Sequence, residues 1–362
     1  MRALITARFD GEELERLRGL ADDIRFAGWG VDRKKLTARE MADRVGDLDI
    51  LIVEFEPITE EVLAAARHLK ALVCCRNEPE ANVDVSAATA LGIPVLHTPG
   101  RNAVSVAEYT IGLMLAVSRH IAAAHHLLRH TSELTAVQYE DKMADRRGVT
   151  SEWSLDPTAP FNRFPGPELA GKTLGLVGFG TIGRQIARRA LAFDMRVIVA
   201  DPYVDATAAK RAGAVRCELP ALMRSADFVA IAAKVTPETT GLIGREQIGL
   251  MKPSAYFINT ARAAIVDCDA LHEALAAGRI RGAALDVFPS EPVPADSPFL
   301  RLDNAVLSPH LAGASLDIPR HHSRQAVDGL MSLFAGRMPH GLANPEVWAA
   351  RRAVDGGAPG GR

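Results

Sequence analysis

Short apolar runs recur along this chain, and helix-like segments separate them. Five runs lie in the first hundred residues, at 2–6, 24–29, 49–55, 71–76 and 93–98. A second series begins at 173–178 and continues at 196–201, 228–233, 255–260, 283–287 and 305–309. Continuous apolar runs are typical of strands covered on both faces, and their alternation with helices predicts parallel sheets. We therefore expect an α/β chain with two doubly wound parallel-sheet domains, the second built on six strands.

Composition and charge exclude several classes of protein. The chain has 362 residues, with 42 Lys and Arg against 44 Asp and Glu, so neither nucleic acid nor an anionic membrane is an expected partner. The N-terminal apolar run is too short for a signal peptide, and the helical run 111–117 is far shorter than the roughly 20 residues that cross a bilayer. The four cysteines lack zinc-ligand spacing, which favours reduced thiols, no metal site and a cytoplasmic location.

A glycine-rich turn follows the strand predicted at 173–178. Gly178, Gly180 and Gly183 form a GxGxxG pattern that closes this strand and opens a helix. Such glycines permit a tight turn, close backbone approach to a pyrophosphate and close helix–strand packing. Asp201 ends the next strand, where a carboxylate accepts hydrogen bonds from a ribose diol and repels a 2′-phosphate. The pattern predicts NAD rather than NADP, against the alternative of a plain glycine turn with a helix-capping Asp.

Three later strands each end near a residue of catalytic type, at the edge where open α/β sheets bind ligands. These residues are Arg262, Glu291 and His310. The guanidinium of an Arg can bind carboxylate and carbonyl oxygens. The imidazolium of a His can donate a proton as a hydride reaches a carbonyl carbon, and the carboxylate of a Glu can fix the tautomer of that imidazole. The three therefore predict hydride-transfer reduction of a 2-oxo acid. Four other histidines are interpreted as solvated: His125, His126, His321 and His322.

Longer motifs point the same way. They are NVDVSAATALGIPVLHTPGRNAVSVAEYTIGLMLAVSR, ELAGKTLGLVGFGTIGRQIARRA, VTPETTGLI, NTARAAIVDCDAL, GAALDVFPSEP and SPHLAG. From about Leu72 to Pro345 the chain resembles the D-isomer-specific 2-hydroxyacid dehydrogenases. The resemblance implies an NAD-dependent oxidoreductase that transfers a hydride between NAD(H) and a 2-hydroxy or 2-oxo carboxylic acid. The acid could be of the phosphoglycerate, hydroxypyruvate or glyoxylate type, or a sugar acid.

The resemblance also implies roles for individual residues. Arg262 would anchor the substrate, His310 would be the acid/base and Glu291 would be its partner. Asp286 would lie near the nicotinamide amide, and Asp201 would bind the adenosine ribose. The remaining implied cofactor contacts come from Thr181, Ile182 and Ala261, and the implied substrate contacts from Arg76, Asn77 and Asn102.

The family's architecture implies a discontinuous arrangement of domains. Residues 1–103 and 311–350 would form a flavodoxin-like substrate domain, and 104–310 a Rossmann NAD-binding domain. The apolar stretch 105–130 is predicted to be one long buried helix, the dimerisation arm of a homodimer. Residues 131–167 form an insertion without periodicity, whose role stays open. The last segment, 351–362, is predicted to be a disordered tail.

One loop departs from the family pattern. Where the family usually carries glycines whose N–H groups bind the substrate carboxylate, this chain has Asn77, Glu78 and Glu80. The carboxylates of Glu78 and Glu80 would disfavour small dianionic substrates, unless they point outward or the positive charge of Arg76 offsets their negative charge. A second function is compatible with the same fold and triad. It is an NAD-sensing regulatory binding protein that resembles the C-terminal-binding corepressors.

Overall fold

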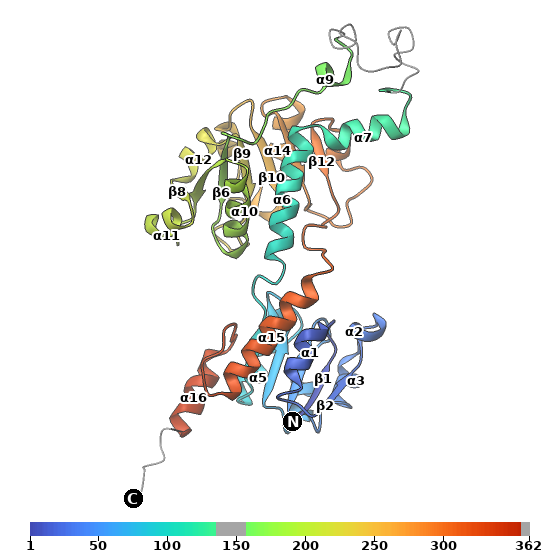
Figure 1. The fold of residues 1–362 in the computed structure, drawn as a ribbon, viewed down its shortest axis with the longest axis vertical. Coiled ribbons are helices and arrows are strands. Elements are labelled where there is room, and N and C mark those ends of the chain that lie inside the picture. Colours follow the sequence, from blue (N-terminus) through green and yellow to red (C-terminus); the bar gives the residue numbers. More distant parts are fainter. Residues whose placement is uncertain (135–156, 356–362) are drawn as a thin grey trace, which may run out of the picture. The chain divides into compact units, whose positions relative to one another are not determined.

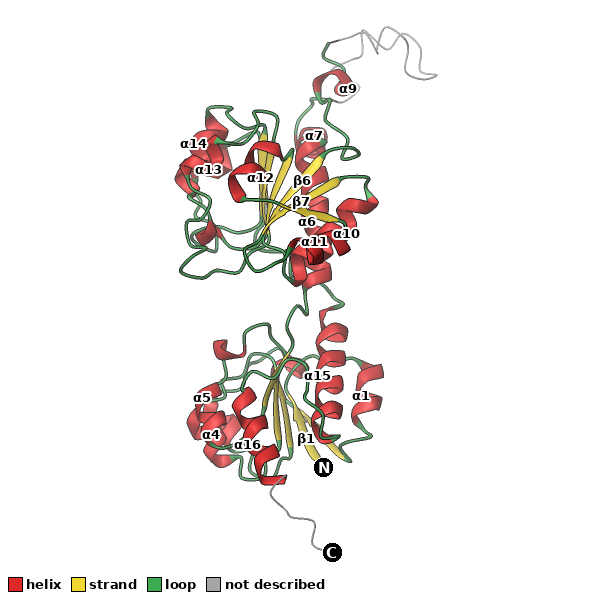
Figure 2. Cartoon of the chain, turned by 90° about the vertical axis from the view of Figure 1, so that its left-hand side faces the viewer, coloured by secondary structure: helices red, strands yellow, loops and turns green. Residues whose placement is uncertain are grey.

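The computed structural model describes residues 1–134 and 157–355, which form two compact units (Figure 1). Unit 1 comprises Met1–Asn102 and Ser315–Arg362, and unit 2 comprises Ala103–Ala314. In each unit the strands lie between helices (Figure 2). All paired strands within the two sheets are parallel, which confirms the predicted α/β class.

Unit 1 is built on a five-stranded sheet in the order β2-β1-β3-β4-β5. Its strands are β1 (Arg2–Ile5), β2 (Asp23–Phe26), β3 (Ile50–Val53), β4 (Ala71–Cys74) and β5 (Val95–His97). The sequences ILIV of β3 and ALVC of β4 are buried throughout, because both strands are internal and covered on both faces. Strand β2, DIRF, lies at the edge and is mostly exposed.

Helices cover both faces of the unit 1 sheet. They are α1 (Gly11–Leu17), α2 (Trp29–Asp32), α3 (Ala38–Ala42), α4 (Glu60–Ala65), α5 (Val85–Ala90), α15 (Ile318–Phe334) and α16 (Pro345–Asp355), with a 3-10 turn η1 (Pro79–Ala81). Several begin at a side-chain cap. Asp10 accepts hydrogen bonds from the first turn of α1, and Thr37 forms a capping box with Glu40 at α3.

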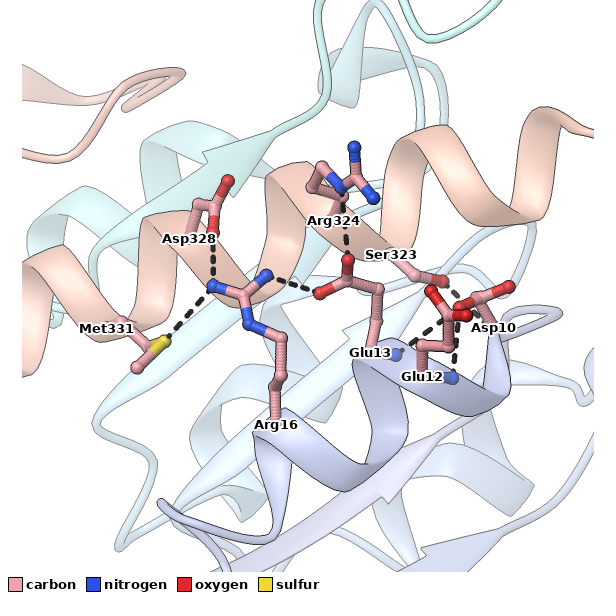
Figure 3. Close-up of polar contacts among 8 residues, drawn as sticks. All are labelled: Asp10, Glu12, Glu13, Arg16, Ser323, Arg324, Asp328 and Met331. Carbon is pink, nitrogen blue, oxygen red and sulfur yellow. Dashed lines mark hydrogen bonds and ion pairs between the residues drawn. The ribbon is translucent and has the colours of Figure 1, made fainter.

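Polar contacts join α15, from the end of the chain, to α1 at its beginning (Figure 3). The buried carboxylate of Glu13 accepts hydrogen bonds from Arg16 and Arg324, and Arg16 also bonds Asp328 at 2.6 Å. A buried charge is costly unless it is paired, so these arginines are what allow Glu13 to lie under α15. The contact ties the C-terminal part of unit 1 to its N-terminal part.

Unit 2 is built on a seven-stranded sheet in the order β12-β11-β10-β9-β6-β7-β8. Its strands are β6 (Thr173–Val177), β7 (Arg196–Ala200), β8 (Ala214–Arg216), β9 (Phe228–Ile231), β10 (Tyr256–Asn259), β11 (Gly282–Leu285) and β12 (Ala305–Leu307). The sequence analysis predicted six strands for this domain, and the structure has a seventh, β8. This edge strand has three residues, of which only Ala214 is buried, so it leaves no apolar run in the sequence.

Helices also cover both faces of the unit 2 sheet. They are α6 (Ala103–Ser118), α7 (Ile121–His130), α9 (Pro160–Arg163), α10 (Thr181–Ala192), α11 (Ala206–Arg211), α12 (Leu219–Ser225), α13 (Arg245–Gly249) and α14 (Cys268–Ala276), with 3-10 turns η3 (Ala263–Ile265) and η4 (Pro298–Arg301). Helices α6 and α10 contribute to one apolar core, and α12, α13 and α14 contribute to a second.

The stretch 105–130 is two helices and not the single one predicted. His120 adopts a left-handed φ of 55°, which interrupts the helix, and α6 and α7 meet at a bend of 65°. The apolar side chains of α6, such as Ile111 and Met114, are buried in the core of unit 2 itself. Helix α7 has no buried residue, and Ile121 and Leu128 are more than half exposed. The large apolar side chains of this stretch that are exposed therefore lie on α7.

Two further predictions concern the C-terminal segment 351–362 and the insertion 131–167. Helix α16 continues to Asp355, so residues 351–355 are helical and not part of a disordered tail. The sequence PEVWAARRAVD is rich in good helix formers and starts with Pro, which explains the extension. The rest of that tail, 356–362, and most of the 131–167 insertion, 135–156, lie outside the described residues.

Among the described residues, no single helix is long and apolar enough to cross a membrane, and only the bent pair α6 and α7 reaches the length and composition of a span.

Candidate active site

The glycine-rich turn lies between β6 and α10, at the carboxyl edge of the unit 2 sheet. Gly178 has a φ of 96°, a conformation that side chains disfavour. A Cβ atom built on it would lie 2.6 Å from the backbone nitrogen of Ala233 and 2.7 Å from the carbonyl carbon of Ala232. Both the backbone angle and the space therefore require glycine here.

The other two glycines differ in what surrounds them. A Cβ atom on Gly183 would lie 2.6 Å from the carbonyl oxygen of Gly178, so glycine lets α10 pack against the turn. A Cβ atom on Gly180 would meet nothing within 4 Å, and no side chain caps α10, which begins at Thr181. The protein's own packing therefore does not require glycine at 180. Open space before an uncapped helix N-terminus fits the pyrophosphate of a dinucleotide, near Thr181 and Ile182.

Asp201 follows β7 and is fixed beside this turn. Its Oδ2 accepts a hydrogen bond from the N–H of Phe179 at 2.7 Å, and its Oδ1 accepts one from the N–H of Tyr203 at 2.9 Å. Each carboxylate oxygen has a further lone pair for a ribose hydroxyl. Two of the three arginines of α10 have contacts within unit 2, since Arg184 lies over the Phe179 ring at 4.8 Å and Arg189 pairs with a glutamate of α6. The turn thus presents a carboxylate to a bound nucleotide.

His310 and Glu291 come together as the sequence predicted. His310 Nδ1 lies 2.6 Å from Glu291 Oε2, and Glu291 Oε1 accepts the N–H of Phe288 at 3.0 Å. Partial burial would raise the pKa of Glu291, but the hydrogen bonds from His310 and from the Phe288 N–H outweigh it and lower the pKa. The ring nitrogen Nε2 is left for a substrate, because Glu291 occupies Nδ1.

Arg262 follows β10, the strand next to β11. Its Nη1 donates to the carbonyl oxygen of Ala261 at 2.6 Å. The buried Asn259 holds both residues, because its side chain donates to the Arg262 carbonyl and accepts the Ala261 N–H, each at 3.0 Å. The positive charge of Arg262 also contributes to lowering the pKa of Glu291, so the guanidinium and the His–Glu pair share one electrostatic environment. The sequence analysis did not single out Asn259, because an Asn at a strand end is common in turns and caps and does not by itself indicate a role in a site.

Asp286 is fully buried at the end of β11. Its Oδ1 accepts hydrogen bonds from Ser308 Oγ at 2.6 Å and from the Leu311 N–H at 2.8 Å, and its Oδ2 accepts one from the Ala312 N–H at 2.8 Å. These donors belong to the loop that carries His310. The contact with a nicotinamide amide stays a prediction, and the hydrogen bonds that the Asp286 side chain accepts come from this loop.

The predicted substrate loop belongs to unit 1, at the carboxyl edge of its sheet. The Arg76 guanidinium lies 5.3 Å from the centre of the Phe55 ring. Asn77 Oδ1 accepts the Gly100 N–H at 2.8 Å, and Asn77 Nδ2 donates to Asn102 Oδ1 at 3.2 Å, so both amides are part of the loop's own bonding. The nearby carboxylates Glu78 and Glu80 are on exposed residues.

His322 is not solvated, contrary to the prediction. It lies on the inner face of α15 with no exposed surface. Its Nδ1 is 3.1 Å from Arg101 Nη1, and its Nε2 is 2.6 Å from the Arg8 carbonyl oxygen. The same Arg101 nitrogen pairs with the buried carboxylate of Glu54 at 2.6 Å. This buried cluster of unit 1 was missed because α15 is amphipathic and a His on its inner face has no distinguishing signal in the sequence.

Among the described residues, no group of three or more His, Cys, Asp or Glu is arranged to hold a metal ion, and all four cysteines are free thiols. Burial raises the pKa of the Cys74 thiol to about 12 and that of Cys268 to about 11, so neither is a nucleophile near neutral pH.

Comparison with known proteins decides the family. A family model described as "D-isomer specific 2-hydroxyacid dehydrogenase, NAD binding domain" matches residues 111–312. The chain belongs to the D-isomer specific 2-hydroxyacid dehydrogenase family. This membership confirms the family predicted from the motifs and NAD as the cofactor, and it places the chain among the NAD-dependent oxidoreductases of 2-hydroxy acids.

Individual relatives agree with this assignment. The glyoxylate reductase of Thermofilum pendens is 36% identical over 86% of this chain and 86% of its own length. The D-3-phosphoglycerate dehydrogenase of Methanocaldococcus jannaschii is 37% identical over 85% of this chain, which spans about half of that relative, 54%. The crystal structure of the TT0316 protein from Thermus thermophilus is 33% identical, with a TM-score of 0.67 over 95% of this chain and all of that one.

Proposed function

We propose that this dehydrogenase-family chain reduces a small 2-oxo acid to the D-2-hydroxy acid and runs the reverse oxidation, with Arg262, Glu291 and His310 as the catalytic residues. The observation that carries the proposal is the 2.6 Å contact between His310 and Glu291 beside the charge of Arg262. All three residues lie at the carboxyl edge of the sheet that also bears the glycine turn.

Each residue has a chemical task in this reaction. The Arg262 guanidinium binds the carboxylate and carbonyl oxygens and so orients the carbonyl carbon. When bound, NADH supplies the hydride that reduces this carbon. His310, protonated at Nε2, gives that proton to the carbonyl oxygen, which becomes the hydroxyl group. The Glu291 carboxylate keeps Nδ1 protonated and stabilises the imidazolium before the transfer. In the oxidation direction neutral His310 takes the hydroxyl proton back.

Asp201 is the basis for a preference for NAD over NADP. Its carboxylate is fixed by two backbone N–H groups beside the glycine turn. A 2′-phosphate placed against it would suffer like-charge repulsion, whereas a 2′-hydroxyl would donate a hydrogen bond. We propose that unit 2 binds the cofactor, and Arg76 stays a predicted contact of the acid.

Monoanionic 2-oxo acids, such as those of the glyoxylate or hydroxypyruvate type, are the proposed substrates, ahead of phosphorylated acids. The relative from Thermofilum pendens is named a glyoxylate reductase and matches over most of both chains. The loop carboxylates of Glu78 and Glu80 add negative charge near Arg76, which disfavours a second anionic group on the substrate.

A homodimer that forms through α7 is also proposed, with a cytoplasmic location. Ile121 and Leu128 are 55% and 56% exposed on a helix without any buried residue, and a twofold partner helix would cover them. The four free cysteines suit a reducing compartment.

A turnover assay tests the proposal. Wild type, His310→Ala and the control Asp303→Asn, an exposed residue of unit 2, are assayed with NADH and glyoxylate, hydroxypyruvate, phosphohydroxypyruvate and a 2-oxo sugar acid. We expect turnover by wild type and the control, and a loss of roughly 10²–10⁴ in kcat for His310→Ala. NADH binding without turnover of any acid would instead favour the regulatory binding protein.

A further inference from the structure

We propose that His126 and His130 of helix α7 form a binding site for a divalent transition-metal ion of the Ni²⁺, Cu²⁺ or Zn²⁺ class. The two imidazoles are the protein ligands, and water fills the remaining positions. None of the residues assigned to the reaction belongs to α7, so the inference goes beyond the proposed function and does not depend on it. The four cysteines, which carry the expectation of no metal site, take no part in it.

The two histidines have the spacing of a chelating pair. They stand four residues apart on one helix, an interval that places two side chains on the same face in successive turns. Their ring centroids are 5.0 Å apart, with 39° between the ring planes. Two imidazoles that share one metal, with bonds of about 2.1 Å and an angle of about 90–110°, have centroids roughly 4.6–5.3 Å apart. The rings therefore already stand at the separation that a shared ion requires.

Both rings are available to an ion from solvent. His126 and His130 are exposed, and neither has a hydrogen bond or an ion pair with another residue in the described ranges 1–134 and 157–355. Imidazole nitrogen is a ligand that Ni²⁺, Cu²⁺ and Zn²⁺ accept, whereas Mg²⁺ and Ca²⁺ prefer oxygen. The ligand type therefore selects the transition metals.

The position of the pair within α7 favours a cation. The helix ends at His130, and the carbonyl groups of its last turn carry partial negative charge. The guanidinium of Arg129 opposes a metal ion, but Arg129 is exposed and its charge is screened by salt. The helix end thus adds to the attraction that the imidazoles provide.

Helix α7 also gains stability from such an ion. It has ten residues and none of them is buried, so packing contributes little to its stability, and a helix of this length is marginal in water. An ion that bonds to both histidines when they lie one turn apart binds the helix in preference to the unwound segment. It therefore stabilises α7 by mass action.

Isothermal titration of the untagged full chain with NiCl₂ tests the site in wild type, His126→Gln, His130→Gln and the control His125→Gln. His125 is exposed on the same helix, but no histidine lies three or four residues from it. We expect either substitution in the pair to raise the Kd for Ni²⁺ by roughly tenfold or more, because the second imidazole no longer binds the ion intramolecularly. The control should bind Ni²⁺ as wild type does, and MgCl₂ should not compete.

Hydrogen exchange of the α7 amides is the second readout. Ni²⁺ should slow exchange over 121–130 in wild type and in His125→Gln, but not in His126→Gln. All three substitutions replace exposed side chains, so the variants keep the fold. Absence of Ni²⁺ binding to wild type at millimolar concentration would overturn the proposal, as would equal affinity in wild type and both pair variants. A loss in His125→Gln as large as in the pair, or binding that leaves exchange of α7 unchanged, would also overturn it.

Discussion

Replacing His322 by Gln perturbs a buried imidazole that links the stability of the chain to pH. The ring on α15 lies between Arg101 and the carbonyl oxygen of Arg8, near the carboxylate of Glu54. Burial lowers the pKa of His322 from 6.5 to about 4, although the hydrogen bond to the Arg8 carbonyl and the charge of Glu54 act in the opposite direction. The folded chain therefore holds this ring in its neutral form near neutral pH.

The size of this effect on the free energy of unfolding follows from the difference between the pKa of His322 in the unfolded chain and its pKa in the folded chain. The unfolded chain takes up the His322 proton near pH 6.5, whereas the folded chain takes it up only near pH 4. The contribution of the neutral ring to stability is thus fully present above about pH 6.5 and is lost as the pH falls. At 1.36 kcal/mol per pH unit the whole effect is about 3 kcal/mol, of which about 2 kcal/mol is lost between pH 7.5 and pH 5.

Urea unfolding at pH 7.5 and pH 5 measures this loss in wild type, His322→Gln and the neighbouring control His321→Gln. Gln offers an oxygen to Arg101 and an N–H to the Arg8 carbonyl, so it preserves the two contacts without a titrating group. The free energy of unfolding of His322→Gln should fall by about 2 kcal/mol less than that of wild type over this interval. The control should follow wild type. Equal pH dependence in all three proteins would refute the reasoning.

Three other variants test the site and the assembly. Glu291→Gln should lower kcat for reduction, but by less than His310→Ala does, because the general acid stays in place and loses only the carboxylate bonded to its Nδ1; an unchanged kcat would reject the pairing. Asp201→Ser should narrow the ratio of kcat/KM for NADH over NADPH, by roughly tenfold or more, whereas equal use of both cofactors by wild type would contradict the role of Asp201. Leu128→Glu should convert a dimer to a monomer of 38.8 kDa in sedimentation, and a wild-type monomer would remove the case for the α7 interface.

Several features of the fold and site could be predicted from the sequence because they have strong local signals. The buried strands β3 and β4 are uninterrupted apolar runs and β6 is nearly so, and Gly178 and Gly183 stand where the backbone leaves no room for a side chain. Arg262 and His310 could be placed near strand ends because each follows an apolar run that predicts a strand. His310 and Glu291 follow different strands, yet a parallel sheet brings successive strand ends to one edge.

Other features depend on tertiary structure and have no local signal. The break between α6 and α7 depends on one left-handed residue, His120, in a sequence that otherwise favours continuous helix. His322 is buried because of the face of α15 that it occupies, and the pattern of that helix does not distinguish a buried His from a solvated one. The three donors to Asp286 come from a loop whose turn could not be read from the residues SPHLA.

The central claim is that this chain moves a hydride between NAD(H) and C2 of a 2-oxo acid, with His310 as the proton donor. The test is an incubation with NADH deuterated at C4, in separate 4R and 4S forms, followed by mass spectrometry and chiral chromatography. The acid is the best of the panel other than glyoxylate, because reduction of glyoxylate gives a product without D and L isomers. One of the two labelled cofactors should give the D-2-hydroxy acid with a single deuterium at C2, and His310→Ala should form it far more slowly. Product without deuterium at C2 from either cofactor, or the L isomer, would contradict the account.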